Sequence, residues 1–167
     1  MRCSAAVALA ALGCRDPGPL VDMSLWSRVE AADDPFDDRP DDVRCSSAAT
    51  YVEATTGTPS LEIDTGLCNY LLLSQPSLRE VRADDLVEVW IFHDQLLADA
   101  PAEAHAVIRL GSWEAWGLRA PIPSDPEVYI ESAEAPETFP EGTPVWLHLH
   151  NHGDNTWNLF EVTMSPP

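Results

Sequence analysis

The sequence contains no lysine, and arginine supplies all nine of its Lys and Arg positions. Against these stand 28 aspartates and glutamates, so the net charge at pH 7 is −19. A protein that binds nucleic acid neutralises phosphates with lysine and arginine, and a protein that docks on an anionic bilayer needs a basic patch. The composition therefore argues against both kinds of partner.

Signatures of several enzyme classes are also missing. The sequence has no Gly-x-Ser-x-Gly elbow and no glycine-rich phosphate loop, so neither a serine hydrolase nor a nucleotide-binding enzyme is indicated. It shows no internal repeat and no alternation of strand and helix patterns. Acidic pairs are too abundant for any one pair to stand out as catalytic. We therefore expect a binding module without enzymatic activity, and an enzyme is the alternative.

From Val43 onward the sequence is a succession of short β-like stretches. Fifteen prolines and eight glycines interrupt the chain, as expected where turns join many strands. Residues 86–93 and 103–110 place apolar side chains at every second position, which is typical of a strand with one face in the core. About eight or nine such strands predict an all-β fold over residues 43–167, an antiparallel, jelly-roll-like β-sandwich.

Residues 1–14 have the features of an export signal. Arg2 precedes a short apolar run at residues 5–12, and the segment closes with Ala-Leu-Gly-Cys at residues 11–14. It resembles the signal peptide and lipobox of bacterial lipoproteins, although Ala11 stands where leucine is usual. The resemblance implies that Cys14 is lipidated and anchors the protein in the bacterial cell envelope, at the outer membrane or the periplasmic face. An ordinary secretory signal and an uncleaved tail are the alternatives.

The cysteines fit an exported protein. On the lipoprotein interpretation, Cys3 is removed with the signal and Cys14 carries the lipid, which leaves Cys45 and Cys68. In an oxidising compartment this pair is predicted to form a disulfide, with two buried free thiols as the alternative.

Residues 15–42 show no strong periodicity. Residues 31–42 contain six aspartates and two prolines, a composition typical of a solvated segment. We therefore expect a disordered acidic linker, or tether, over residues 15–42. A calcium loop is the alternative, but the aspartates occur in pairs and lack the alternate spacing and central glycine of an EF-hand loop.

Histidines occupy alternate positions near the C-terminus, at His148, His150 and His152. If residues 145–151 form a strand, His148 and His150 share one face with Trp146, while the valine and leucines between them share the other. Two imidazoles at this spacing lie about 7 Å apart and can converge on one metal ion. His152 would lie at the following turn.

A third metal ligand must come from another strand, and His105 and His93 are the candidates. Histidine sites, with or without a carboxylate, suit Zn(II) or Cu(II) as the cofactor. The pattern resembles the His-x-His strand of cupins, copper–zinc dismutases and sandwich-fold copper monooxygenases. Structural histidines that bond backbone groups or carboxylates are the alternative.

Three tryptophans are candidates for a ligand-binding platform: Trp113, Trp116 and Trp146. Exposed aromatic side chains bind sugars and other ligands, but large aromatics are more often half-buried core residues. Two functions remain in view. The leading one is a non-enzymatic envelope lipoprotein whose β-sandwich binds a small molecule, a glycan or a protein partner. The other is a metal-binding protein or metalloenzyme built on the histidines.

Overall fold

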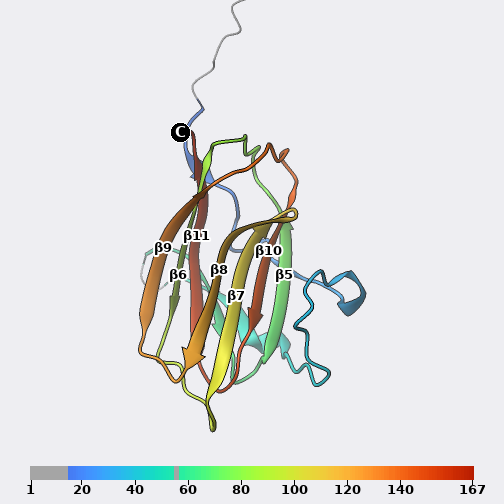
Figure 1. The fold of residues 1–167 in the computed structure, drawn as a ribbon, viewed down its shortest axis with the longest axis vertical. Helices are drawn as coiled ribbons and strands as arrows, with labels where there is room; N and C mark the ends of the chain where they lie inside the picture. The colour runs from blue at the N-terminus through green and yellow to red at the C-terminus, as the bar shows by residue number, and fades with distance from the viewer. Residues whose placement is uncertain (1–14, 55–56) are drawn as a thin grey trace, which may run out of the picture.

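The computed structural model describes residues 15–54 and 57–167 as two antiparallel β-sheets packed face to face (Figure 1). The predicted signal segment, including Cys14, lies outside the described residues. Helical structure in the described part is limited to two 3-10 turns, η1 (Ala31–Asp33) and η2 (Ser47–Ala49). No helix there is long and apolar enough to cross a membrane.

The strand order confirms the predicted antiparallel, jelly-roll-like sandwich. One sheet has the order β3-β4-β11-β6-β9, with β1 added along β11, and the other has the order β2-β5-β10-β7-β8. The strands of the first sheet are β1 (Gly18–Pro19), β3 (Thr50–Glu53), β4 (Ser60–Asp64), β6 (Leu86–His93), β9 (Glu127–Glu134) and β11 (Thr156–Ser165). Those of the second are β2 (Ser27–Arg28), β5 (Tyr70–Pro76), β7 (Ala102–Leu110), β8 (Trp113–Ile122) and β10 (Pro144–His150). Apart from the β7–β8 hairpin, successive strands from β4 onward alternate between the sheets, as in a jelly roll.

The core lies between the sheets and follows the alternation of the strands. On β10, Val145, Leu147 and Leu149 point inward and are buried, as predicted. Opposite them on the first sheet lie apolar residues of β6 and β11, including Ile91 and Leu159. The inward face of β10 thus secures the register of the strand, because a slip by one residue would expose every one of these side chains.

The predicted linker is the main error of the sequence interpretation. Residues 15–42 are an ordered part of the domain: β1 pairs with β11, and β2 pairs with β5. Leu20 and Phe36 are buried, and the segment runs beside β5 in Figure 1. The many aspartates suggested solvation, but two of them, Asp34 and Asp38, bond to side chains on the second sheet. We call residues 34–39 the strap, because they lie across the outer face of that sheet.

Two covalent or ionic links hold this N-terminal segment. Cys45 and Cys68 form the predicted disulfide and are also paired as an isolated antiparallel bridge. This link fixes the chain just after the strap to the turn that leads into β5. At the other end, Arg15 donates to the buried carboxylate of Asp85, with 2.6 Å between Nη1 and Oδ2. The segment is therefore fastened on both sides of the strap.

Candidate functional site

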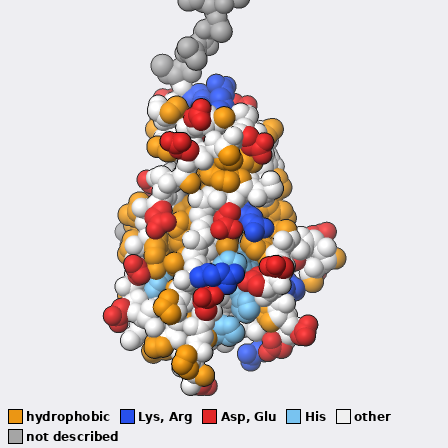
Figure 2. Space-filling view, in the orientation of Figure 1, with side chains coloured by type: hydrophobic (Ala, Val, Ile, Leu, Met, Phe, Trp, Pro, Cys, Tyr) orange, Lys and Arg blue, Asp and Glu red, His pale blue; other side chains and the backbone are white. Residues whose placement is uncertain are grey.

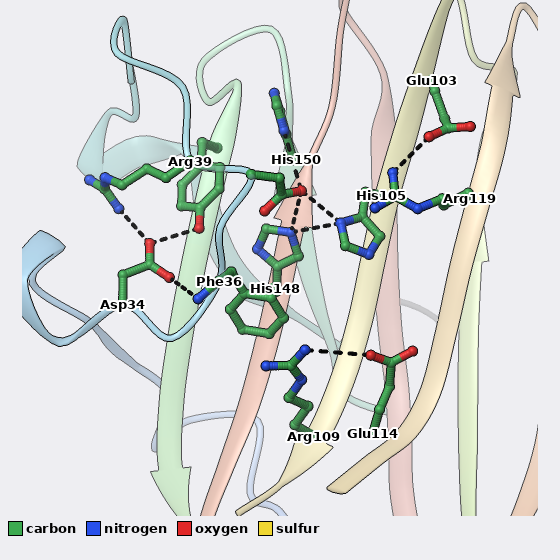
Figure 3. Close-up of polar contacts among 12 residues, drawn as sticks. Asp34, Phe36, Arg39, Glu103, His105, Arg109, Glu114, Arg119, His148 and His150 are labelled. Atoms are coloured by element: carbon green, nitrogen blue, oxygen red, sulfur yellow. Dashed lines mark hydrogen bonds and ion pairs between the residues drawn. The ribbon is translucent and has the colours of Figure 1, made fainter. Parts of the chain in front are cut away.

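The outer face of the second sheet carries three histidines that converge on one carboxylate (Figure 3). His105 on β7 and His150 on β10 are cross-strand partners, and His148 is paired with Val107. Because side chains on a strand alternate, all three imidazoles project from the face opposite the core. The strap places Asp38 above them.

One oxygen of Asp38, Oδ2, contacts all three rings. It accepts a hydrogen bond from His105 Nδ1 at 2.7 Å and lies 3.2 Å from His148 Nε2. His150 Nδ1 is 3.5 Å away. The two nearer imidazole nitrogens, His105 Nδ1 and His148 Nε2, are 3.3 Å apart. Three imidazole nitrogens from two strands thus lie within 3.5 Å of one carboxylate oxygen of the strap.

His148 is fully buried at the centre of this cluster. The ring of Phe36 in the strap stacks on it with centroids 4.2 Å apart and planes 13° from parallel. Tyr70 on β5 meets it edge-on at 5.1 Å. Apolar and aromatic groups therefore cover His148 on the side where solvent would otherwise reach the sheet.

The strap is held by contacts on both sides of Phe36. Asp34 Oδ2 accepts a hydrogen bond from the Tyr70 hydroxyl at 2.7 Å and pairs with Arg39 at 3.0 Å. On the other side, the Arg109 guanidinium lies 4.1 Å from the centroid of the Phe36 ring, a cation–π contact. The Asp34 and Phe36 contacts hold the strap on the N-terminal side of Asp38. On the C-terminal side, the Arg39 guanidinium lies 5.0 Å from the centroid of the Tyr70 ring. None of these contacts uses the Asp38 carboxylate, so the donor set is organised in advance.

The charge states suit a metal ligand set. Burial is the largest influence on the pKa of His148 and lowers it to about 4 against the attraction of Asp38. Burial likewise lowers the pKa of His150. Both rings are therefore neutral at pH 7, which is the form that ligates a metal.

The Asp38 carboxylate is ionised at the same pH. Burial alone would raise the pKa of Asp38, but the hydrogen bond from His105 and attraction by His148 outweigh that effect and hold the pKa below its ordinary value. Since His148 is neutral at pH 7, we assign most of the lowering to His105. The cluster therefore combines one negative charge with imidazole donors.

Two of the three donor–donor distances in this cluster are close to those of a tetrahedral zinc site, and the third, between His105 Nδ1 and Asp38 Oδ2, is shorter at 2.7 Å. Ligands placed about 2.0–2.1 Å from Zn(II) at tetrahedral angles lie about 3.3 Å from one another. The distances from His148 Nε2 to the other two donors, 3.3 Å and 3.2 Å, match that value. Asp38 Oδ1 and His148 Nδ1 are buried and have no hydrogen-bond partner among the described residues. Asp38, His105 and His148 thus form a cluster whose ligand atoms all lie within 4.8 Å of one another.

The structure brings together three of the five histidines singled out in the sequence, and His152 is their neighbour. His152 is exposed at the turn after β10, with its ring centroid 5.1 Å from that of His150. The inclusion of His93 was wrong. It points into the sandwich from β6, its ring lies 4.7 Å from that of Trp157, and Nδ1 donates to the Asp94 carbonyl oxygen.

The tryptophans do not form a common platform. Trp116 is buried between the sheets, so the prediction of an exposed platform is wrong for this residue. Trp113 is half-buried and stacks on Phe139, with ring centroids 5.8 Å apart. Trp146 lies on the opposite, outer face of the sheet, where it packs against the cluster that contains Phe36.

Asp38 is the candidate ligand that sequence reasoning missed. It lies within the run of paired aspartates that predicted a solvated linker, and nothing in the spacing distinguishes it from Asp37 or Asp41. The one available signal was Phe36, a lone aromatic residue inside an acidic segment. A large apolar side chain at such a position indicates packing against the domain.

Comparisons with known proteins give no family for this chain. No protein-family model matches it, and no curated protein matches it. Similar solved structures include a CBM4 carbohydrate-binding module at 12% identity and a TM-score of 0.45, covering 79% of this chain and 99% of that one. TmCBM61 in complex with β-1,4-galactotriose matches at 7% identity and a TM-score of 0.48, covering 75% and 87%. These identities and TM-scores are too low for the two structures to indicate a function for this chain. Its fold is assigned from its own strand pairing.

Proposed function

We propose that this protein is a metal-binding β-sandwich module that holds a Zn(II) or Cu(II) ion between the strap and the second sheet. The observation that carries the proposal is the convergence of Asp38 Oδ2, His105 Nδ1 and His148 Nε2 within 4.8 Å of one another. His150 supplies a fourth donor, 3.5 Å from Asp38 Oδ2. One carboxylate and three imidazoles are ligands that both ions accept.

The site suits storage, transfer or structural binding better than catalysis. A catalytic zinc keeps one coordination position open for water or substrate. Here Phe36 stacks on the buried ring of His148 and shields it from solvent, and His150 lies beside Asp38 as a further donor. Metal binding would also fasten the strap to the sheet, because Asp38 is the one donor that the strands do not supply.

Calorimetric titration with Zn(II) tests the proposal. The metal-free protein should bind one equivalent, and Asp38→Asn should weaken binding at least about tenfold, because it removes the anionic ligand. Asp37→Asn is the matched control, since it makes the same chemical change at the exposed neighbouring residue and should leave the affinity unchanged. Absence of metal uptake by the unmodified protein would mean that the histidines form only a hydrogen-bonded network.

We further propose that the protein works in the bacterial cell envelope, anchored by lipid on Cys14. The lipobox-like segment and the disulfide between Cys45 and Cys68 support this location. The described chain begins beside the C-terminal strand, whereas His152 follows the far end of β10 (Figure 1). A lipid at Cys14 would therefore leave the histidine end of the sandwich facing away from the membrane.

Replacing the cysteine tests the anchor. Cys14→Ser should move the protein from the membrane fraction to the soluble fraction of the producing cell, because no acyl chain can then be attached. Cys3→Ser is the matched control and should leave the protein with the membranes. Membrane association that survives Cys14→Ser would contradict the lipoprotein assignment.

A further inference from the structure

The metal cluster adjoins a polar groove at the end of the sandwich. The groove is lined by the β10–β11 turn, by residues 97–102 before and at the start of β7, and by residues of the segment that follows the strap. His150 belongs both to this groove and to the cluster, since it lines the former and approaches Asp38 in the latter. Figure 2 views the outer face of the second sheet and shows histidine side chains reaching the surface in its lower half.

The histidines become progressively more buried from the groove to the cluster. His152 is exposed, the His150 side chain is 18% accessible, and His148 is completely covered. The His152 and His150 ring centroids are 5.1 Å apart. From His150 the path into the cluster leads through Asp38 Oδ2, which lies 3.5 Å from His150 Nδ1 and 3.2 Å from His148 Nε2.

The charge lining the groove favours cations. Asp42, Asp99 and Asp154 line it, and Arg44 is the only Lys or Arg side chain among the lining residues that the structure describes. Clefts lined by charge of one sign raise the local concentration of the opposite ion and its association rate. The groove therefore draws divalent cations toward the two outer histidines.

We propose that His152 is a capture ligand that takes a hydrated divalent ion from solvent and passes it through His150 to the buried cluster. The inference rests on the proposed metal-binding function and adds a pathway to it. At each step an imidazole nitrogen replaces one coordinated water, which returns to solvent, and the ion keeps its charge. In the final state His152 is released, because the ion then lies among Asp38, His105, His148 and His150.

A capture ligand changes the association and dissociation rates of the ion by a similar factor and leaves its dissociation constant unchanged. His152→Asn should slow association of Cu(II), followed by stopped-flow quenching of tryptophan fluorescence, about tenfold, and should slow dissociation by a similar factor. The dissociation constant should stay within about twofold of the unmodified value. The variant should fold normally, because the side chain is exposed and the carbonyl oxygen that accepts hydrogen bonds from Asn151 and Asn155 belongs to the backbone of His152.

Asp154→Asn distinguishes capture of the ion by the His152 imidazole from long-range electrostatic attraction by the acidic groove. It should slow association only at low ionic strength, whereas the effect of His152→Asn should persist in high salt. An unchanged association rate in His152→Asn would overturn the capture role and leave the proposed metal site intact. Faster dissociation with weaker affinity would also overturn it, since His152 would then be a permanent ligand. Absence of Cu(II) uptake by the unmodified protein would overturn both proposals.

Discussion

At the scale of single residues, His148 shows how burial sets the chemistry of the cluster. Its side chain is inaccessible to solvent and stacks on Phe36, so the protonated form would lose its hydration and gain only the nearby Asp38 in return. The ring therefore stays neutral over the whole physiological pH range, ready to donate its lone pair to a metal.

The burial of His148 predicts a loss of stability in acid for the metal-free protein. The pKa of His148 is about 4 in the folded chain and about 6.5 in the unfolded chain. Its contribution is therefore complete above about pH 6.5 and is lost as the pH falls toward 4, because the unfolded chain takes up the proton first. The expected loss over that interval is about 3 kcal/mol.

Urea denaturation at pH 7, 5.5 and 4.5 in the presence of a chelator measures this effect. His148→Gln should flatten the pH dependence of the unfolding free energy between about pH 6.5 and 4.5, since glutamine does not titrate. His152→Gln, at an exposed position, should keep the original dependence. Equal slopes for the unmodified protein and His148→Gln would contradict the assigned protonation state.

At the scale of elements, the strap is the part on which the site depends. Its sheet-facing contacts are the Phe36 stack, the Asp34 bond to Tyr70, and the Asp38 contacts with the histidines. Phe36→Ala should detach the strap while both sheets stay folded. Global stability should then fall by less than the roughly 3–5 kcal/mol typical of Phe→Ala in a core.

Hydrogen exchange of the amides at residues 34–39, measured by mass spectrometry, reports strap opening. It should accelerate in Phe36→Ala, and Zn(II) affinity should fall about tenfold because Asp38 is no longer held in place. Leu25→Ala removes an exposed apolar side chain and should change neither quantity. Unchanged zinc affinity in Phe36→Ala would show that Asp38 is not a ligand delivered by the strap.

The strands could be predicted from the sequence because each one alternates over enough residues. The period of two on β10 assigned Val145 and Leu147 to the core, and it assigned His148 and His150 to the outer face, as the structure confirms. Pairing between strands could not be predicted, because alternation carries no information about neighbours. His93 was therefore included as a candidate third ligand although its strand, β6, belongs to the other sheet. The strand itself was correctly predicted.

The strap could not be predicted because its order comes from tertiary contacts. Its composition alone is that of a solvated segment, and what overrides composition is the complementary surface that β5, β7 and β10 assemble. Phe36 stacks on the ring of His148 and contacts the guanidinium of Arg109. These two residues belong to strands that are far apart in the sequence. Asp38 likewise contacts His105 and His148, which belong to two different strands.

At the scale of the whole molecule, the jelly roll separates the first and last strands of the described chain from the histidine cluster. The first sheet carries the first and last strands of the described chain, with β1 paired to the last residues of β11. The second sheet carries the strap and the histidines on its outer face. The net charge of −19 adds to this arrangement, because it attracts cations to the molecule as a whole and disfavours polyanionic partners.

The location of a bound ion tests the central claim most directly. A crystal of the protein grown with Zn(II) should show one strong anomalous peak at the zinc absorption edge. It should lie about 2.0–2.2 Å from Asp38 Oδ2, His105 Nδ1 and His148 Nε2. A peak elsewhere on the molecule, or none at these three atoms under saturating zinc, would contradict a metal site between the strap and the second sheet.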